Sequence, residues 1–155
     1  MLSEAIEKWR CQTEKIIGPV ILGEEKTTIS RKVVFLIDDN SDALAYNRII
    51  LEDDFEIFTA QSGQEALEII SEITRPDLIL LDMRMEGMSG PEFLLALEKK
   101  CPELIEKIPV VFLTAMDKVP ASKAVGFIRK PYELNNFLKD VHRFIETGSG
   151  HPNKY

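Results

Sequence analysis

The fold is decided by the stretch Val33-Val34-Phe35-Leu36-Ile37-Asp38-Asp39, in which five apolar residues are followed at once by two aspartates. A short, uniformly apolar run rich in β-branched residues predicts a strand that is covered on both faces, as in the middle of a parallel sheet. Four further short apolar runs follow along the chain, and the third and fourth of the five runs are also apolar throughout. The predicted strands are Val33–Ile37 and residues 55–59, 78–81, 109–113 and 126–128.

Amphipathic segments separate these strands. The predicted helices are residues 41–51, 64–73, 90–100 and 132–145. Ser41 and Ser62 are candidate N-caps, Pro91 falls early in its helix, and Gly148 follows the last one. Strands that alternate with helices predict a doubly wound α/β domain with right-handed crossovers.

Composition restricts the class of protein. The chain has 155 residues, 45% hydrophobic and 29% charged, which is typical of one globular domain. Its net charge of −7 disfavours direct binding to nucleic acid. Only two cysteines are present, and neither a leader nor an apolar run of membrane-spanning length is apparent. We therefore expect a cytoplasmic protein without a membrane or nucleic-acid partner.

We divide the chain into residues 1–31, an N-terminal helical extension and linker, residues 32–147, the α/β domain, and residues 148–155, a flexible tail. The extension carries an apolar stripe that includes Trp9, so we expect it to pack on the domain or on a second chain. Pro120 interrupts residues 115–125, where we predict a loop with at most a stunted helix.

Polar residues follow the predicted strands. Asp38 and Asp39 come after the first strand, Asp82 after the third, Thr114 after the fourth and Lys130 after the fifth. The carboxyl ends of parallel strands share one edge of the sheet, where open α/β sheets bind their ligands. Two carboxylates about 4 Å apart repel by roughly 1 kcal/mol in water and about 4 kcal/mol at an effective dielectric of 20. Three aspartates, Lys130 and one Mg²⁺ sum to zero charge, so the pattern predicts a magnesium site.

These residues carry a family resemblance. Leu36-Ile37-Asp38-Asp39-Asn40, Leu80-Leu81-Asp82-Met83, Leu113-Thr114-Ala115 and Lys130-Pro131 occur in the order seen in response-regulator receiver domains of two-component signalling. Residues 32–147 resemble this family, and the chain looks like a stand-alone, chemotaxis-regulator-like member. The resemblance implies a flavodoxin-like five-stranded parallel sheet of order 2-1-3-4-5. Here the fourth helix would be shortened and an N-terminal helix added.

The resemblance also implies the roles of the carboxylates. Asp82 would be the phosphoacceptor, phosphorylated by a sensor histidine kinase, a phosphotransfer protein or a small acyl phosphate. Asp39, Asp82 and the main-chain carbonyl of Arg84 would bind Mg²⁺, with Asp38 acting through water. An unidentified downstream protein would read the phosphorylated state, and we allow for a homodimer. The domain would catalyse only its own phosphorylation and dephosphorylation.

Residues around the phosphoacceptor receive roles in the same way. Thr114 and Lys130 would stabilise the phosphoryl group, and Pro131 is a candidate for a cis peptide bond. Phe127 is either the switch aromatic that moves with Thr114 or an ordinary core residue.

Other function classes remain open at this point. The domain could be a receiver-fold scaffold that does not turn over phosphate. A haloacid-dehalogenase-type phosphatase also uses an aspartate nucleophile and Mg²⁺, but it needs a second aspartate where Arg84 stands. A flavodoxin-like cofactor binder needs a Gly/Ser/Thr-rich loop after the first strand, where this chain has Asp38-Asp39.

Overall fold

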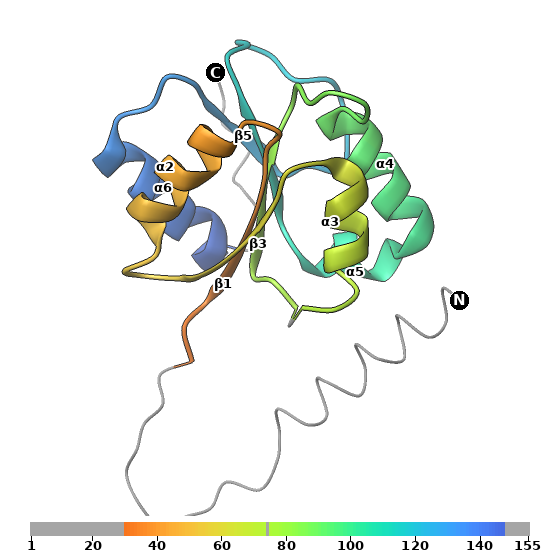
Figure 1. The fold of residues 1–155 in the computed structure, drawn as a ribbon, viewed down its shortest axis with the longest axis horizontal. Helices are drawn as coiled ribbons and strands as arrows, with labels where there is room; N and C mark the ends of the chain where they lie inside the picture. Colours follow the sequence, from red (N-terminus) through yellow and green to blue (C-terminus); the bar gives the residue numbers. More distant parts are fainter. Residues whose placement is uncertain (1–29, 74, 148–155) are drawn as a thin grey trace, which may run out of the picture.

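The computed structural model describes residues 30–73 and 75–147, which form a three-layer α/β domain (Figure 1). Five parallel strands make one sheet of order β2-β1-β3-β4-β5. The strands are β1 (Val33–Ile37), β2 (Glu56–Ala60), β3 (Leu78–Asp82), β4 (Val110–Thr114) and β5 (Gly126–Arg129). The predicted strands and their order are confirmed, with ends that differ by at most one residue.

Helices cover both faces of the sheet. They are α2 (Ser41–Leu51), α3 (Gly63–Ile69), α4 (Gly90–Lys100), α5 (Pro102–Lys107) and α6 (Leu134–Thr147). Helices α2 and α6 lie on one face, and α3, α4 and α5 lie on the other (Figure 1). Every residue of β1, β3 and β4 is buried, as expected for strands between two helical layers.

Each face has its own hydrophobic core. Phe35, Ile79 and Phe112 pack among the residues of α3, α4 and α5. On the opposite face, Leu36 and Leu80 pack against α2 and α6. Consecutive residues of one strand thus enter different cores, because side chains alternate across a sheet. This arrangement fixes the register of the central strands and the position of the residues that follow them.

Several helix ends differ from the sequence prediction. Asn40, and not Ser41, is the N-cap of α2, because its side chain accepts hydrogen bonds from the amides of Asp42 and Ala43. Ser62 caps α3 as predicted. Helix α3 ends at Ile69 and not at residue 73. Just past this end, the Ser71 hydroxyl donates a hydrogen bond to the carbonyl of Glu68.

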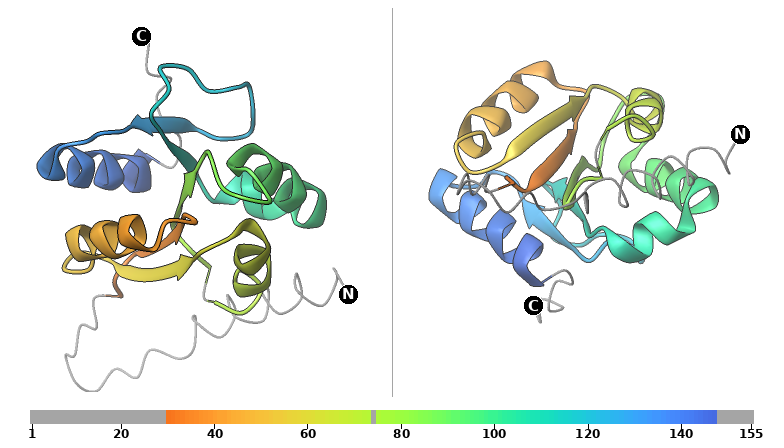
Figure 2. Two further views of the ribbon diagram at one scale, coloured as in Figure 1. Left: turned by 45° about the horizontal axis from the view of Figure 1, so that its top comes forward. Right: turned by 90° about the horizontal axis from the view of Figure 1, so that it is seen from below.

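Two further differences concern the second half of the chain. Helix α5 was not predicted, although Pro102 at its first position is a typical helix start. Helix α6 begins at Leu134 and not at 132, because Tyr132 belongs to the preceding loop and bonds to α2. Residues 115–125 join β4 to β5 as a long loop, as predicted, but they contain no helix, so the fourth helix that was expected to be shortened is absent (Figure 2). The predictions for residues 1–29 and 148–155 lie outside the described residues.

Candidate functional site

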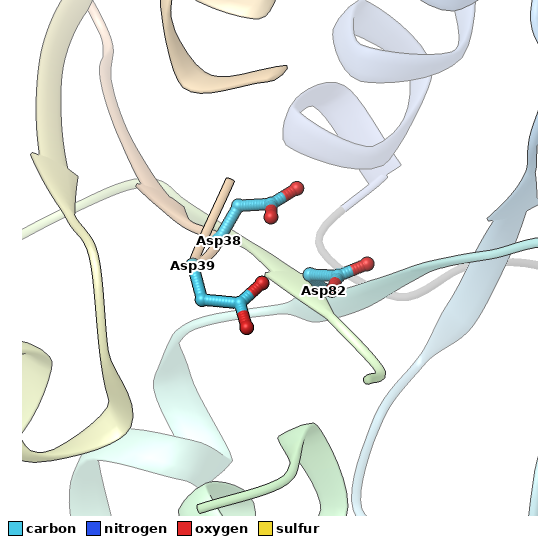
Figure 3. A group of neighbouring side chains, drawn as sticks. All are labelled: Asp38, Asp39 and Asp82. Atoms are coloured by element: carbon cyan, nitrogen blue, oxygen red, sulfur yellow. The ribbon is translucent and has the colours of Figure 1, made fainter. Parts of the chain in front are cut away.

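Three carboxylates meet at the carboxyl edge of the sheet (Figure 3). Asp38 and Asp39 follow β1, and Asp82 is the last residue of its neighbour β3. One oxygen from each side chain lies within 4.8 Å of the others. Asp38 and Asp82 are only 2% and 8% exposed, whereas Asp39 is exposed to solvent. The strand order therefore brings together the three aspartates that the sequence singled out.

Backbone hydrogen bonds hold two of these carboxylates in place. The amide of Asn40 donates to Oδ1 of Asp38 at 2.9 Å, and the amide of Glu86 donates to Oδ2 of Asp39 at 2.8 Å. Both donors lie in the loops that follow β1 and β3. The loops thus orient carboxylates that would otherwise separate by mutual repulsion.

Gly90 allows α4 to begin directly beside Asp82. A Cβ atom at Gly90 would lie 2.5 Å from the main-chain oxygen of Asp82 and 3.0 Å from Cα of Met83. The Gly90 amide also donates to the carbonyl of Met83 at 3.1 Å. Only glycine permits this approach, so the residue supports the end of β3 that carries Asp82.

Lys130 reaches the carboxylates from the end of β5. Its Nζ atom lies 2.9 Å from Oδ1 of Asp82 and 3.5 Å from Oδ2 of Asp38. Its backbone amide donates to the carbonyl of Thr114 at 2.7 Å, which fixes the start of the loop beside β4. With three aspartates and one lysine, the site carries a formal charge of −2.

Burial raises the pKa of the Asp82 carboxyl above its ordinary value; the Lys130 hydrogen bond lowers it, and the charge of Asp38 raises it further. For Lys130, burial lowers the pKa. The hydrogen bond to Asp82 and the charges of Asp82 and Asp38 outweigh burial, so the pKa of the lysine is raised overall. Lys130 is therefore a firmly charged partner, whereas the charge on Asp82 is costly in this environment.

A cavity of about 330 Å³ opens beside Asp82, with Thr114, Lys130 and Arg84 in its lining. Thr114 is 4% exposed, and its Oγ1 accepts a hydrogen bond from the Met116 amide at 3.1 Å. The hydroxyl proton of Thr114 can therefore be donated to a ligand oxygen in the cavity. The Arg84 side chain is exposed. A negative group in this cavity would meet a cation and a hydroxyl donor next to the Asp82 carboxylate.

The remaining two predicted residues lie on β5 and just after it. Phe127 is half-buried on β5 opposite Phe112, and it packs against the core shared with α3 and α4. This position is compatible with either role considered for Phe127. The Lys130–Pro131 peptide bond is cis, as the sequence analysis expected.

Two residues beside the site were missed by the sequence analysis. Asn47 of α2 is 1% exposed, and its Oδ1 accepts a hydrogen bond from the Tyr132 hydroxyl at 2.5 Å. Asn47 could have been noticed as an amide on the otherwise apolar face formed by Leu44, Ile50 and Leu51. Tyr132 carried no comparable signal, because its partner lies 85 residues away.

The family model for the response regulator receiver domain matches residues 34–142. The chain belongs to this family. In this receiver domain the matched region includes all three clustered aspartates, Thr114 and Lys130. Family membership therefore favours a signalling receiver of two-component systems over the phosphatase and the cofactor binder.

Similar proteins agree with this assignment. The chain is 28% identical over 127 residues to sporulation initiation phosphotransferase F of Bacillus subtilis, covering 78% of this chain and 98% of the relative. It is 36% identical over 126 residues to a probable cyclic di-GMP phosphodiesterase of Vibrio cholerae, covering 77% of this chain but 28% of that protein. Among solved structures, chemotaxis protein CheY4 of Vibrio cholerae matches with a TM-score of 0.65 and 28% identity, covering 73% and 98% of the two chains.

The relatives differ in length. The receiver domain spans nearly all of the Bacillus protein but only about a quarter of the regulatory protein LuxO of Vibrio cholerae. In residues 30–73 and 75–147, none of the helices has the length and apolar character needed to span a bilayer.

Proposed function

We propose that Asp82 is the residue that accepts the phosphoryl group. The observation that carries this proposal is the contact between the nearly buried Asp82 and Lys130, at the mouth of a cavity that Thr114 also lines. An oxygen of Asp82 would attack the phosphorus of a phosphohistidine and form an acyl phosphate. The bond from phosphorus to the donor nitrogen breaks, and its electron pair stays with the donor imidazole.

The acidic cluster fits Mg²⁺. Its donors are carboxylate oxygens, which magnesium prefers, and their mutual repulsion gives a cation a reason to bind. We assign direct contacts to Asp39, Asp82 and the main-chain carbonyl of Arg84, with Asp38 acting through water. The bound cation would raise the formal site charge from −2 to zero and so permit a phosphoryl group to approach. Lys130 would neutralise a phosphoryl oxygen from the opposite side.

Thr114 and Phe127 form the proposed switch. The Thr114 hydroxyl would donate to a phosphoryl oxygen on Asp82, leaving its present contact with the Met116 amide. Phe127, half-buried on the neighbouring strand, would move into the space that Thr114 vacates. A local charge change would in this way bias a two-state element of the fold.

The proposed partners follow from this chemistry. A sensor histidine kinase or a phosphotransfer protein would donate the phosphoryl group in the cytoplasm, and a downstream protein would bind the phosphorylated surface. The relative from Bacillus subtilis is named as a phosphotransferase, which favours a role in phosphoryl relay. Beyond catalysing its own phosphorylation and dephosphorylation, the domain would have no enzymatic activity. We also propose that residues 32–147 form the receiver unit, with residues 1–31 as an extension and 148–155 as a tail.

Phosphotransfer from a phosphohistidine donor tests this proposal. A phosphorylated histidine phosphotransfer protein is mixed with the wild-type chain, the Asp82→Asn variant and the Asp53→Asn variant. Asp53 is an exposed carboxylate past the end of α2 and serves as the matched control. We expect wild type and Asp53→Asn to take up the phosphoryl group from the donor and Asp82→Asn to take up none. Phosphorylation of Asp82→Asn at the wild-type rate would contradict the proposal. A wild-type chain that takes up no phosphoryl group would favour the receiver-fold scaffold.

A further inference from the structure

Lys130 borders two open spaces. Its side chain is 30% exposed, and it lines both the cavity beside Asp82 and a second groove of about 530 Å³ that Tyr46, Asn47 and Tyr132 also line. Asp82 and Asp38 hold its ammonium group, at 2.9 Å and 3.5 Å, but the flexible stem of the side chain borders open space on two sides. Whether the Nζ atom reaches these carboxylates therefore also depends on where the loop holds the Lys130 backbone.

The loop from β5 to α6 is mostly exposed. Between Arg129 and Asn136, only Lys130 and Tyr132 are partly buried. The Tyr132 ring stacks on the buried Phe137 of α6, with centroids 4.1 Å apart and an angle of 11° between the planes. Its hydroxyl donates to Asn47 on α2. Tyr132 thus attaches this loop to two helices.

Asn47 is a buried polar residue that packing alone does not explain. It is 1% exposed on the face of α2 that otherwise carries Leu44, Ile50 and Leu51. An amide buried on an apolar face costs free energy that a leucine of similar size would not. Its Oδ1 accepts the hydrogen bond of the Tyr132 hydroxyl, and burial raises the pKa of that phenol further above neutrality. A local cost of this kind is typical of a residue kept for function.

We propose that the hydrogen bond between Asn47 and Tyr132 positions Lys130 for phosphoryl acceptance. Tyr132 is two residues from Lys130, whose amide is bonded to Thr114 on β4. The loop is thereby held between α2 on one side and β4 on the other, with the ammonium directed to Asp82. Asn47 and Tyr132 are positioning residues that do not touch the reacting atoms. The inference rests on the proposed roles of Asp82 and Lys130.

The test separates positioning from stability. The double variant Asn47→Leu/Tyr132→Phe removes both polar partners but keeps the volume and the ring stack, so its melting temperature should stay close to that of wild type. The single variant Tyr132→Phe leaves Asn47 unsatisfied and should melt several degrees lower. Phosphorylation by acetyl phosphate with Mg²⁺ is followed as intact mass over time. Because small displacements of a positioned group are costly, we expect the double variant to react about tenfold more slowly than wild type.

Repeating the double substitution in a Lys130→Gln variant shows whether the loss of phosphorylation rate depends on Lys130. Lys130→Gln should be slow by itself, and adding Asn47→Leu/Tyr132→Phe should slow it no further. Mg²⁺ affinity should change less than twofold in the double variant, because neither residue belongs to the cluster of three aspartates.

The outcomes are distinct. A stable double variant that reacts at the wild-type rate would overturn the positioning role, as would an equal loss of rate in the Lys130→Gln background. If the wild type itself gains no phosphoryl group, the proposed function fails before this inference is reached. Slow reaction of a stable double variant, with no further loss in the Lys130→Gln background, is the result that the structure predicts.

Discussion

Substituting Asp39 by Asn should raise the stability of the metal-free domain and lower its response to Mg²⁺. Asp39 lies within 4.8 Å of the carboxylate oxygens of Asp38 and Asp82, and it is exposed to water. At the dielectric of water, each repulsion at this distance costs about 0.9 kcal/mol. The nearby Lys130 offsets part of the sum, so Asp39→Asn should stabilise the metal-free protein by about 1 kcal/mol. The asparagine oxygen can still accept the hydrogen bond from the Glu86 amide.

Thermal unfolding at low ionic strength measures both effects. In EDTA, the variant should melt about 4 °C above wild type, by the usual ratio of free energy to melting temperature for a domain of this size. At a Mg²⁺ concentration a hundredfold above Kd, wild type should gain about 2.7 kcal/mol, and the variant much less because it has lost a ligand charge. The order of the two melting temperatures should therefore reverse.

Asp53→Asn is the control, because it removes an exposed carboxylate at the other end of α2. It should melt like wild type with and without Mg²⁺. The reasoning is refuted if Asp39→Asn melts below wild type in EDTA, or if Mg²⁺ raises both melting temperatures equally.

Three further predictions concern the same site. Burial raises the pKa of Asp82, so its ionised form lowers the stability of the fold at neutral pH, and Asp82→Asn should stabilise the metal-free domain at pH 7. This gain in stability should vanish as the pH falls through the raised pKa toward the ordinary value of 3.8, because the wild-type carboxyl then becomes neutral in the folded state. Denaturation curves of wild type and variant, recorded in pairs at each pH, would show the change. Gly90→Ala should destabilise the fold by about 3 kcal/mol in urea unfolding, because its methyl group would meet the Asp82 carbonyl; wild-type stability would contradict the close approach. Thr114→Val should leave Mg²⁺ affinity unchanged in a titration but slow phosphoryl uptake about tenfold; an unchanged rate would remove Thr114 from the proposed chemistry.

The sequence predicted the central strands well because they are uniformly apolar. A run such as Val33–Ile37 can be buried on both faces only in a sheet between two helical layers, so pattern and packing agree. The aspartates at the carboxyl ends of β1 and β3 could be placed together for the same reason, since the ends of neighbouring parallel strands share one edge. The loop at residues 115–125 was predictable because Pro120 interrupts it.

Features set by tertiary contacts were harder to predict. Asn40 and Ser41 are both good N-cap residues, and only the backbone geometry decides between them. The six residues of α5 give too little periodicity to recognise. The link from Tyr132 to Asn47 depends on the tertiary contact between the loop after β5 and α2, which local sequence does not encode. It also explains why α6 begins two residues later than its apolar pattern indicated.

The most direct test of the account is the intact mass of the chain after incubation with acetyl phosphate and Mg²⁺. We expect a gain of one phosphoryl group, which is absent when EDTA replaces Mg²⁺ and absent in Asp82→Asn, while Asp53→Asn reacts like wild type. A phosphoryl group gained equally by Asp82→Asn, or gained at the same rate in EDTA, would contradict the claim that Asp82 accepts phosphate within a magnesium site formed by Asp38, Asp39 and Asp82.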